Sequence, residues 1–137
     1  MSSFYILGID QSTQGTKAVL FDKNGKIIAR ADEAHEQIVN EQNWVSHNLK
    51  EIYENVIKAS RRVVEKAGID KNQIVCIGID NHRETTAAWN KVTGEPVADA
   101  IVWQCSRAKD ICKRINSDGH TGDKIYRRTG LKLSPYY

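Results

Sequence analysis

A short polar loop near the start of the chain carries residue types that could hold a phosphate group. Ser12, Thr13, Gly15 and Thr16 offer hydroxyls and unhindered backbone N–H groups, Lys17 adds a positive charge, and Asp10 stands just before them. Successive N–H groups in such a loop can cradle an anion. An ordinary hairpin with a polar turn would use the same residues, because short motifs often match by chance. The rest of the chain must therefore decide between the two interpretations.

Two apolar segments flank this loop, and we predict both to be strands. Residues 4–9 and 16–21 each have the length of a buried strand and are rich in Ile, Val, Phe and Tyr. Asn24-Gly25 predicts a tight turn after the second segment, since this pair readily supplies positive φ values. A third strand is expected over about residues 26–33. The three strands would form an antiparallel meander.

A long amphipathic helix is expected after an irregular connection over residues 34–47, which is tied down by one aromatic residue. Asn48 and Glu51 have the spacing of a capping box, and Gly68 is a natural end for the helix. Residues 73–80 follow and read as a fully buried, parallel strand. The apolar stripe of the helix has a 3.6-residue period. It consists of Leu49, Ile52, Tyr53, Val56, Ile57, Val63 and Val64.

The remaining residues alternate between short apolar segments and turns, and nothing in them resembles a repeat or a linker. We therefore predict a single domain over residues 1–137, an incomplete one. The elements expected in this part are a strand over 86–90, a turn over 91–96, an apolar segment over 100–103, and helices over about 106–115 and 123–128, the second ending at Gly130.

Composition and charge exclude several classes of protein. The 20 basic and 17 acidic residues are well mixed and give a net charge of +3, which does not indicate nucleic-acid binding. No apolar run reaches the roughly 18 to 20 residues of a membrane span, and no signal peptide is recognisable. We therefore expect a cytoplasmic protein. Cys76, Cys105 and Cys112 lack metal-ligand spacing and are predicted to be buried, reduced thiols.

The order of the predicted elements resembles the ribonuclease-H-like fold of the actin-like ATPases, an α/β fold with an acidic residue at the end of its first strand. This fold serves many functions, so only the site residues can choose among them. Several separated motifs closely resemble the N-terminal domain of the glycerol kinases in the FGGY carbohydrate kinase family. They span essentially the entire chain: Asp10-Gln11 with Thr13, Asn43-Trp44-Val45 with His47, residues 81–85, residues 100–107, and Thr129-Gly130-Leu131 through Pro135-Tyr136.

The resemblance implies a polyol-binding role for Arg83, Glu84, Trp103 and Tyr136. Their chemistry agrees with it, because a small polyol needs paired donors and acceptors. The Arg83 guanidinium donates in a fixed fork, the Glu84 carboxylate accepts from hydroxyls, and the two aromatic rings can pack against the carbon side. Each residue alone would fit a purely structural role. Their joint spacing favours the site.

The same resemblance implies a nucleotide site at the first loop. Asp10 matches the acidic residue near the Mg²⁺ of bound ATP, and Thr13 and Lys17 match positions beside the ATP phosphates. Phosphoryl transfer consists mostly of positioning and charge neutralisation, which these groups suit. The implied reaction converts ATP and glycerol to ADP and glycerol 3-phosphate. Members of the family are much longer, and their second domain supplies the catalytic base, so residues 1–137 alone are predicted to be inactive. The complete protein is expected to be a homo-oligomer.

Some residues depart from the family pattern. Ser12 stands where the family generally has Gly, Lys17 replaces a common Arg, and His82 replaces a common Gln. We expect Ser12 to narrow the approach to phosphate, and His82 to be a hydrogen-bonding residue that tunes the polyol pocket rather than a general base. These departures leave the substrate open.

Three alternatives remain at this stage. The chain could belong to an FGGY kinase for another sugar or polyol, such as xylulose, ribulose or erythritol. It could be a non-catalytic binding module of the actin-like fold, which would be expected to lack the Arg83, Glu84 and Trp103 set. A ribonuclease-H-like nuclease would need clustered carboxylates for two-metal chemistry, for which Asp10 and Asp80 are the candidates.

Overall fold

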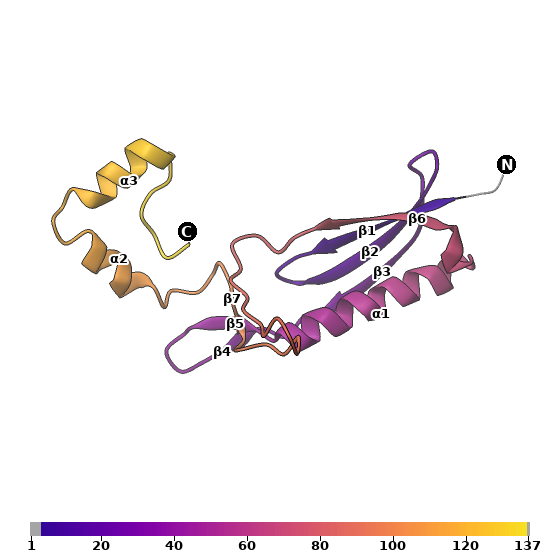
Figure 1. Ribbon diagram of the computed structural model, residues 1–137, viewed down its shortest axis with the longest axis horizontal. Coiled ribbons are helices and arrows are strands. Elements are labelled where there is room, and N and C mark those ends of the chain that lie inside the picture. Colours follow the sequence, from indigo (N-terminus) through magenta and orange to yellow (C-terminus); the bar gives the residue numbers. More distant parts are fainter. Residues whose placement is uncertain (1–3, 137) are drawn as a thin grey trace. The chain divides into compact units, whose positions relative to one another are not determined.

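The computed structural model describes residues 4–136, and its chain forms two compact units (Figure 1). Unit 1 contains the described residues up to Glu36 together with Asn48–Arg83. Unit 2 contains Gln37–His47 together with the described residues from Glu84 onward. The chain therefore leaves unit 1 and returns to it once before it continues into the rest of unit 2. In the described residues no helix is long and apolar enough to cross a membrane.

Unit 1 is built on a four-stranded sheet of β1 (Tyr5–Gln11), β2 (Gly15–Asp22), β3 (Ile27–Ala34) and β6 (Ile74–Asp80). The strand order is β3-β2-β1-β6. The first three strands pair antiparallel, while β6 runs parallel to β1. The predicted meander and the predicted parallel strand are both confirmed (Figure 1).

The turn between β2 and β3 forms where Asn24-Gly25 predicted it. Gly25 has a φ of 79°, and the Asp22 carboxylate accepts hydrogen bonds from the backbone N–H groups of Asn24 and Lys26 at 2.8 and 2.9 Å. These two bonds, that of Lys26 foremost, lower the pKa of Asp22 because they stabilise its charged form. The sequence pattern predicted positive φ values for the Asn24-Gly25 pair. Of the two residues, Gly25 alone has a positive φ.

Helix α1 (Leu49–Ala67) begins and ends at the residues that the sequence predicted. The Asn48 side chain accepts hydrogen bonds from the N–H groups of Lys50 and Glu51, and Gly68 ends the helix with a φ of 63°. A glycine adopts this left-handed conformation without the steric cost that a Cβ would add. The Glu51 carboxylate accepts from the Glu36 N–H at 3.0 Å and so ties the preceding chain to the helix.

The core of unit 1 lies between α1 and one face of the sheet, where the helix packs against β1, β2 and β3 (Figure 1). Val63 is fully buried, as its place in the predicted stripe required. Tyr53 was wrongly placed in that stripe, because its side chain is 68% exposed. Ala59 was missed, since a small side chain gives little periodicity signal, yet it is fully buried against the sheet. The core residues are Leu7, Ile9, Ala18, Leu20, Ala31, Ala59 and Val63.

Strand β6 is not the fully buried strand that its apolar sequence predicted. Val75, Ile77 and Ile79 are 64%, 56% and 72% exposed. The strand stands last in the sheet order, next to β1, while α1 packs mainly on the other three strands. Cys76 in the same strand is exposed, which corrects the prediction of a buried thiol, whereas Cys105 is buried. The apolar run therefore indicated a strand correctly but not its burial.

Unit 2 contains a small sheet of β4 (Ile38–Val39), β5 (Val45–His47) and β7 (Ala100–Ile101). The predicted irregular connection over 34–47 is thus wrong, because it holds the antiparallel β4–β5 hairpin. Its turn is stabilised by the Asn40 side chain, which accepts from the N–H groups of Gln42 and Trp44 at 3.0 and 2.9 Å. An Asn-centred turn of this kind can close a hairpin whose strands are too short to show as an apolar run in the sequence.

The strand predicted over residues 86–90 does not form. This segment makes only isolated bridges, Thr86 to Ile101 and Trp89 to Pro96. The Asn90 side chain accepts from the N–H groups of Val92 and Thr93 at 2.8 and 3.1 Å and starts a turn there.

Two helices complete unit 2, α2 (Lys109–Ile115) and α3 (Thr121–Thr129). Helix α3 starts earlier than predicted, because Asp118 accepts from the N–H groups of His120 and Thr121, both at 2.9 Å. The hydrogen bond from the Thr121 hydroxyl, followed by these two backbone bonds, lowers the pKa of Asp118 to about 2. The helix ends at Gly130 with a φ of 75°, as expected.

Candidate functional site

The loop between β1 and β2 brings together a carboxylate and an ammonium group that the sequence marked as a phosphate site. Asp10 and Lys17 are register partners, and Lys17 Nζ donates to Asp10 Oδ2 at 2.7 Å. Their side chains are 44% and 36% exposed, so solvent and small ligands can reach both. An ion pair this exposed contributes little to folding stability. The pair therefore leaves a charged, accessible group of each sign at the mouth of the loop.

Asp80 lies beside Asp10, because the carboxyl ends of parallel strands β1 and β6 meet at one edge of the sheet. The two residues are register partners. Mg²⁺ prefers oxygen ligands and is commonly held by one or two carboxylates together with substrate phosphates. This donor set suits Mg²⁺, although the described residues hold no group of three or more potential metal-binding side chains.

The turn of the loop is closed by its own residues. Both the backbone N–H and the hydroxyl of Ser12 donate to the Gly15 carbonyl at 3.0 Å. A Cβ added at Gly15 would lie 2.3 Å from the Glu33 carbonyl oxygen, so glycine is required by the close approach of β3. Gly15 therefore has a packing role that the sequence did not indicate. The Ser12 hydroxyl likewise bonds inside the loop.

Thr13, at the tip of the loop, contacts the segment that follows β6. Its Oγ1 lies 3.1 Å from His82 Nε2, and both side chains are half-buried. His82 was expected near the polyol residues, and the structure places its imidazole on the loop predicted to bind phosphate.

A hydrogen-bond network behind the loop was missed by the sequence analysis. The Thr16 hydroxyl donates to Gln11 Oε1 at 2.7 Å, and the Gln11 amide also bonds to the His35 ring. On the other side of that ring, Asn55 of α1 lies 3.0 Å from His35 Nδ1. The signal for it was present, because Gln11 and Thr16 are polar residues that point inward at the ends of apolar strands. The network connects the helix to the base of the loop.

Arg83 and Glu84 lie at the boundary of the two units, where Arg83 is the last residue of unit 1 and Glu84 opens the second part of unit 2. Both side chains are exposed. Glu84 has a φ of 52°, a left-handed conformation that costs free energy for any residue with a Cβ. Strain of this kind is concentrated at functional sites, so it marks Glu84 as a candidate.

Trp103 and Tyr136, both in unit 2, are brought together although they lie far apart in the sequence. Their rings meet edge to face, with centroids 5.7 Å apart and an interplanar angle of 72°. The two side chains are 41% and 38% exposed. They therefore offer an accessible aromatic surface, as expected for residues that pack against the carbon side of a ligand.

The segment after Trp103 is held in place by polar contacts within unit 2. Gln104 accepts from the Gln37 side chain at 2.7 Å. The Arg107 guanidinium lies 5.2 Å from the centre of the Trp44 ring and donates to the Val45 carbonyl at 3.3 Å. Burial is the largest single influence on the pKa of the Cys105 thiol and raises it, but the hydrogen bond from the Arg107 side chain, the backbone groups of Arg107 and Val45 and the Arg107 charge together leave the pKa lowered.

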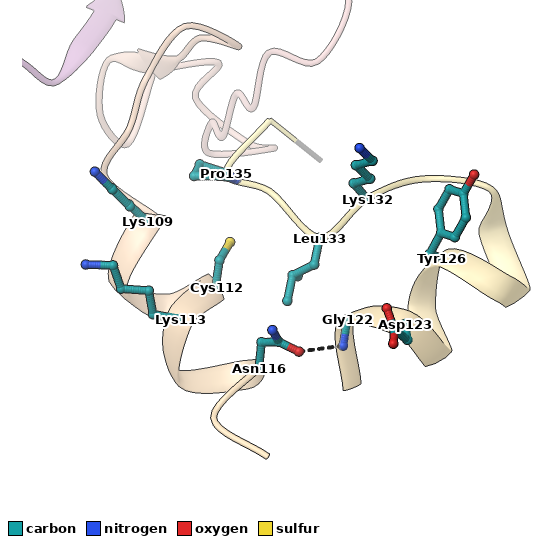
Figure 2. Close-up of a pocket in the computed structure, with 10 residues that line it drawn as sticks. All are labelled: Lys109, Cys112, Lys113, Asn116, Gly122, Asp123, Tyr126, Lys132, Leu133 and Pro135. Atoms are coloured by element: carbon teal, nitrogen blue, oxygen red, sulfur yellow. Dashed lines mark hydrogen bonds between the residues drawn. The ribbon is translucent and has the colours of Figure 1, made fainter. Parts of the chain in front are cut away.

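A separate cavity of about 610 Å³ lies between α2, α3 and the residues that follow them (Figure 2). Asn116 accepts from the Gly122 N–H at 2.8 Å at its floor. Figure 2 shows the Lys109 and Lys113 ammonium groups pointing away from Leu133, another residue that lines the cavity. Among the described residues, none of those predicted to bind a polyol lines this cavity. It is therefore not the predicted site.

A three-stranded meander, a helix packed on it and a parallel strand beside the first strand define the ribonuclease-H-like fold of the actin-like ATPases. The acidic residue near the end of β1 and the polar loop after it lie where the sequence predicted a phosphate site. The model of the FGGY family of carbohydrate kinases, N-terminal domain, matches residues 5–137. The chain belongs to the FGGY family of carbohydrate kinases.

Known proteins agree with this assignment. Glycerol kinase 1 of Thermotoga maritima is 44% identical over 133 residues, which are 97% of this chain and 27% of that protein. Glycerol kinase of Treponema denticola is also 44% identical, with the same coverage. The chain thus spans about a quarter of the length of these relatives.

Solved structures share the fold. The Plasmodium falciparum glycerol kinase with ADP has a TM-score of 0.84 at 31% identity, covering 97% of this chain and 26% of that one. The gluconate kinase of Lactobacillus acidophilus has a TM-score of 0.86 at 27% identity, covering 98% of this chain and 26% of that one.

Proposed function

We propose that the complete protein to which this chain belongs is an ATP-dependent polyol kinase that converts glycerol to glycerol 3-phosphate. The observation that carries the proposal is the Asp10–Lys17 loop at the end of β1, in a chain 44% identical to a glycerol kinase over 97% of its length. The carboxylate suits Mg²⁺, and the ammonium group suits a phosphate oxygen. The ADP in the Plasmodium falciparum glycerol kinase structure supports a nucleotide as the phosphoryl donor.

In this proposal the nucleotide is held by Asp10, Thr13 and Lys17. When bound, Mg²⁺ would neutralise charge on the phosphates, and Asp10 is the residue that would hold it. Lys17 now bonds to Asp10 at 2.7 Å, so its ammonium group is already at the loop and need move little to reach a phosphate oxygen. The Thr13 hydroxyl would donate to a phosphate oxygen.

The polyol would be bound by Arg83, Glu84, Trp103 and Tyr136. The Arg83 guanidinium would donate to hydroxyl oxygens, and the Glu84 carboxylate would accept from hydroxyl groups. The edge-to-face Trp103 and Tyr136 rings, 5.7 Å apart, would pack against the carbon chain. A substrate without hydroxyls would leave these charged groups unpaired, which gives the site its selectivity.

We assign no catalytic base to the described residues. We place it, with most of the adenine pocket, in a second domain C-terminal to residues 1–137, which then form an incomplete N-terminal domain. The 137-residue chain alone is therefore expected to release no ADP in a glycerol-dependent way. The complete protein is expected to be cytoplasmic and homo-oligomeric.

A kinase for another sugar is the second candidate, because the gluconate kinase structure matches the fold with a TM-score of 0.86. Its identity of 27% is well below the 44% of the glycerol kinase from Thermotoga maritima, which favours glycerol.

A substrate panel on the complete protein tests the proposal. We expect kcat/KM to be highest for glycerol among glycerol, dihydroxyacetone, erythritol, xylulose, ribulose and gluconate, measured as ADP release. A higher kcat/KM for any other member would replace glycerol as the substrate. Activity with none of them would overturn the proposed class.

A further inference from the structure

The contact between Thr13 and His82 connects two segments that follow neighbouring strands of unit 1. Thr13 lies in the loop after β1, and His82 lies just after β6. The strands are in register as far as Asp10 and Asp80, so the two segments leave the sheet side by side. Thr13 Oγ1 and His82 Nε2 are 3.1 Å apart, which is a hydrogen-bond distance.

The direction of this hydrogen bond decides what Thr13 can offer a ligand. A hydroxyl group has one proton to donate and can accept from other donors. If His82 Nε2 accepts the Thr13 hydroxyl proton, Thr13 Oγ1 can present only its lone pairs to a phosphate. Those lone pairs repel the phosphate oxygens. If His82 Nε2–H donates instead, the Thr13 proton is left for a phosphate oxygen. The tautomer of His82 therefore controls whether the Thr13 hydroxyl can donate a hydrogen bond to a phosphate oxygen.

We propose that His82 is a positioning residue that donates from Nε2 to Thr13 Oγ1 and so directs the Thr13 proton toward the phosphates of the bound nucleotide. This inference rests on the proposed function, since it assumes that the loop holds a nucleotide. It assigns His82 to the nucleotide side of the reaction rather than to the polyol pocket. Both side chains are half-buried, so the bond is partly protected from competing water.

Two substitutions at His82 separate donation from packing. His82→Gln keeps an amide N–H donor on a side chain of similar reach, while His82→Met has similar length and no donor. We expect His82→Met to weaken MgATP binding about five- to tenfold relative to His82→Gln, the effect of one hydrogen bond. The KM for glycerol should be equal in the two variants. A residue that only supports the fold would change both constants together.

Thr13→Val removes the hydroxyl at nearly constant shape. A double-mutant cycle with this substitution tests whether His82 acts through the Thr13 hydroxyl. In that background the Gln and Met variants should bind MgATP equally, measured by calorimetry on the complete protein. A difference that persists without the hydroxyl, or no difference in its presence, would overturn the role of His82. Wild-type protein that fails to bind MgATP would overturn the proposed function as well.

A measurement on wild-type protein covers the case in which a variant does not fold. ¹⁵N chemical shifts of the His82 ring distinguish its tautomers directly. We expect a protonated Nε2 in the presence of MgATP. A ring protonated at Nδ1 alone would overturn the proposal while leaving the proposed function intact.

Discussion

Lys17 Nζ and Asp10 Oδ2 lie 2.7 Å apart across the paired ends of β2 and β1. The pair is too exposed to contribute much to folding, because solvent screens its charges. Its place at the carboxyl end of the parallel β1–β6 pair is where open α/β sheets bind their ligands. This position supports the proposed role of the loop as a binding element. The effects expected from replacing either residue follow from that role.

Replacing Asp10 separates this role from stability. Asp10→Asn should lower kcat/KM of the complete protein on the order of a hundredfold, since a charged group at the transferring phosphate is lost. The melting temperature should change little. Asp32→Asn is the matched control, because Asp32 is the register partner of Lys17 on the other side, in β3, and bonds to Arg30. Equal loss of activity in both variants would contradict the assignment of Asp10.

Gly15 provides a prediction for the fold around the loop. Gly15→Ala would put a Cβ 2.3 Å from the Glu33 carbonyl oxygen, so β3 must shift. We expect a loss of about 1–3 kcal/mol in the free energy of unfolding, the usual cost of overpacking. Gly78→Ala is the control, because an added Cβ there meets no atom within 4 Å. Urea denaturation that gave the same small effect for both would refute the packing role of Gly15.

Asp118 predicts a pH dependence for α3. Its pKa is lowered from the ordinary value of 3.8 to about 2, so its contribution to stability is present above pH 4 and is lost as the pH falls toward 2. Helix α3 should therefore lose amide protection in that range, as followed by NMR. Asp118→Ala should remove this transition, and Asp118→Asn, which keeps an acceptor, should retain part of the helix start. An acid transition unchanged in Asp118→Ala would show that another group causes it.

The proposed role of the Trp103–Tyr136 pair predicts that a change there alters the KM for glycerol and not the KM for MgATP. Trp103→Ala should raise the KM for glycerol about tenfold, because the ring that packs on the carbon chain is gone. The KM for MgATP should stay within about twofold, a small change on the scale of one hydrogen bond. Trp89→Ala is the control, since Trp89 is 63% exposed and outside the predicted site. A Trp103→Ala protein with an unchanged KM for glycerol would remove Trp103 from the polyol site.

Regular, capped elements were predictable from the sequence. The two ends of α1 are marked in the local sequence by the capping residues Asn48 and Gly68. The meander follows from apolar runs separated by turn residues. The hairpin over residues 38–47 was not predictable in the same way, because its strands have only two and three residues. Its stability comes from the Asn40 side chain and from pairing with β7, a distant segment.

The sequence predicted which residues lie at the candidate site better than it predicted which of them contact one another. Asp10 and Lys17 were correctly expected to lie at one loop, since a hairpin places residues at its mouth opposite each other. The contact between Thr13 and His82 depends on a parallel pairing between strands far apart in sequence, and no local sequence pattern indicates such a pairing. Burial of β6 was mispredicted for a related reason, because an apolar run indicates what a strand can bury rather than what covers it.

The most direct test of the account is to identify the product by ³¹P NMR after incubating the complete protein with MgATP and glycerol. The account predicts glycerol 3-phosphate in equal amount to ADP, and on the order of a hundredfold slower formation of it with Asp10→Asn. Release of inorganic phosphate without glycerol 3-phosphate, or undiminished product with Asp10→Asn, would contradict it.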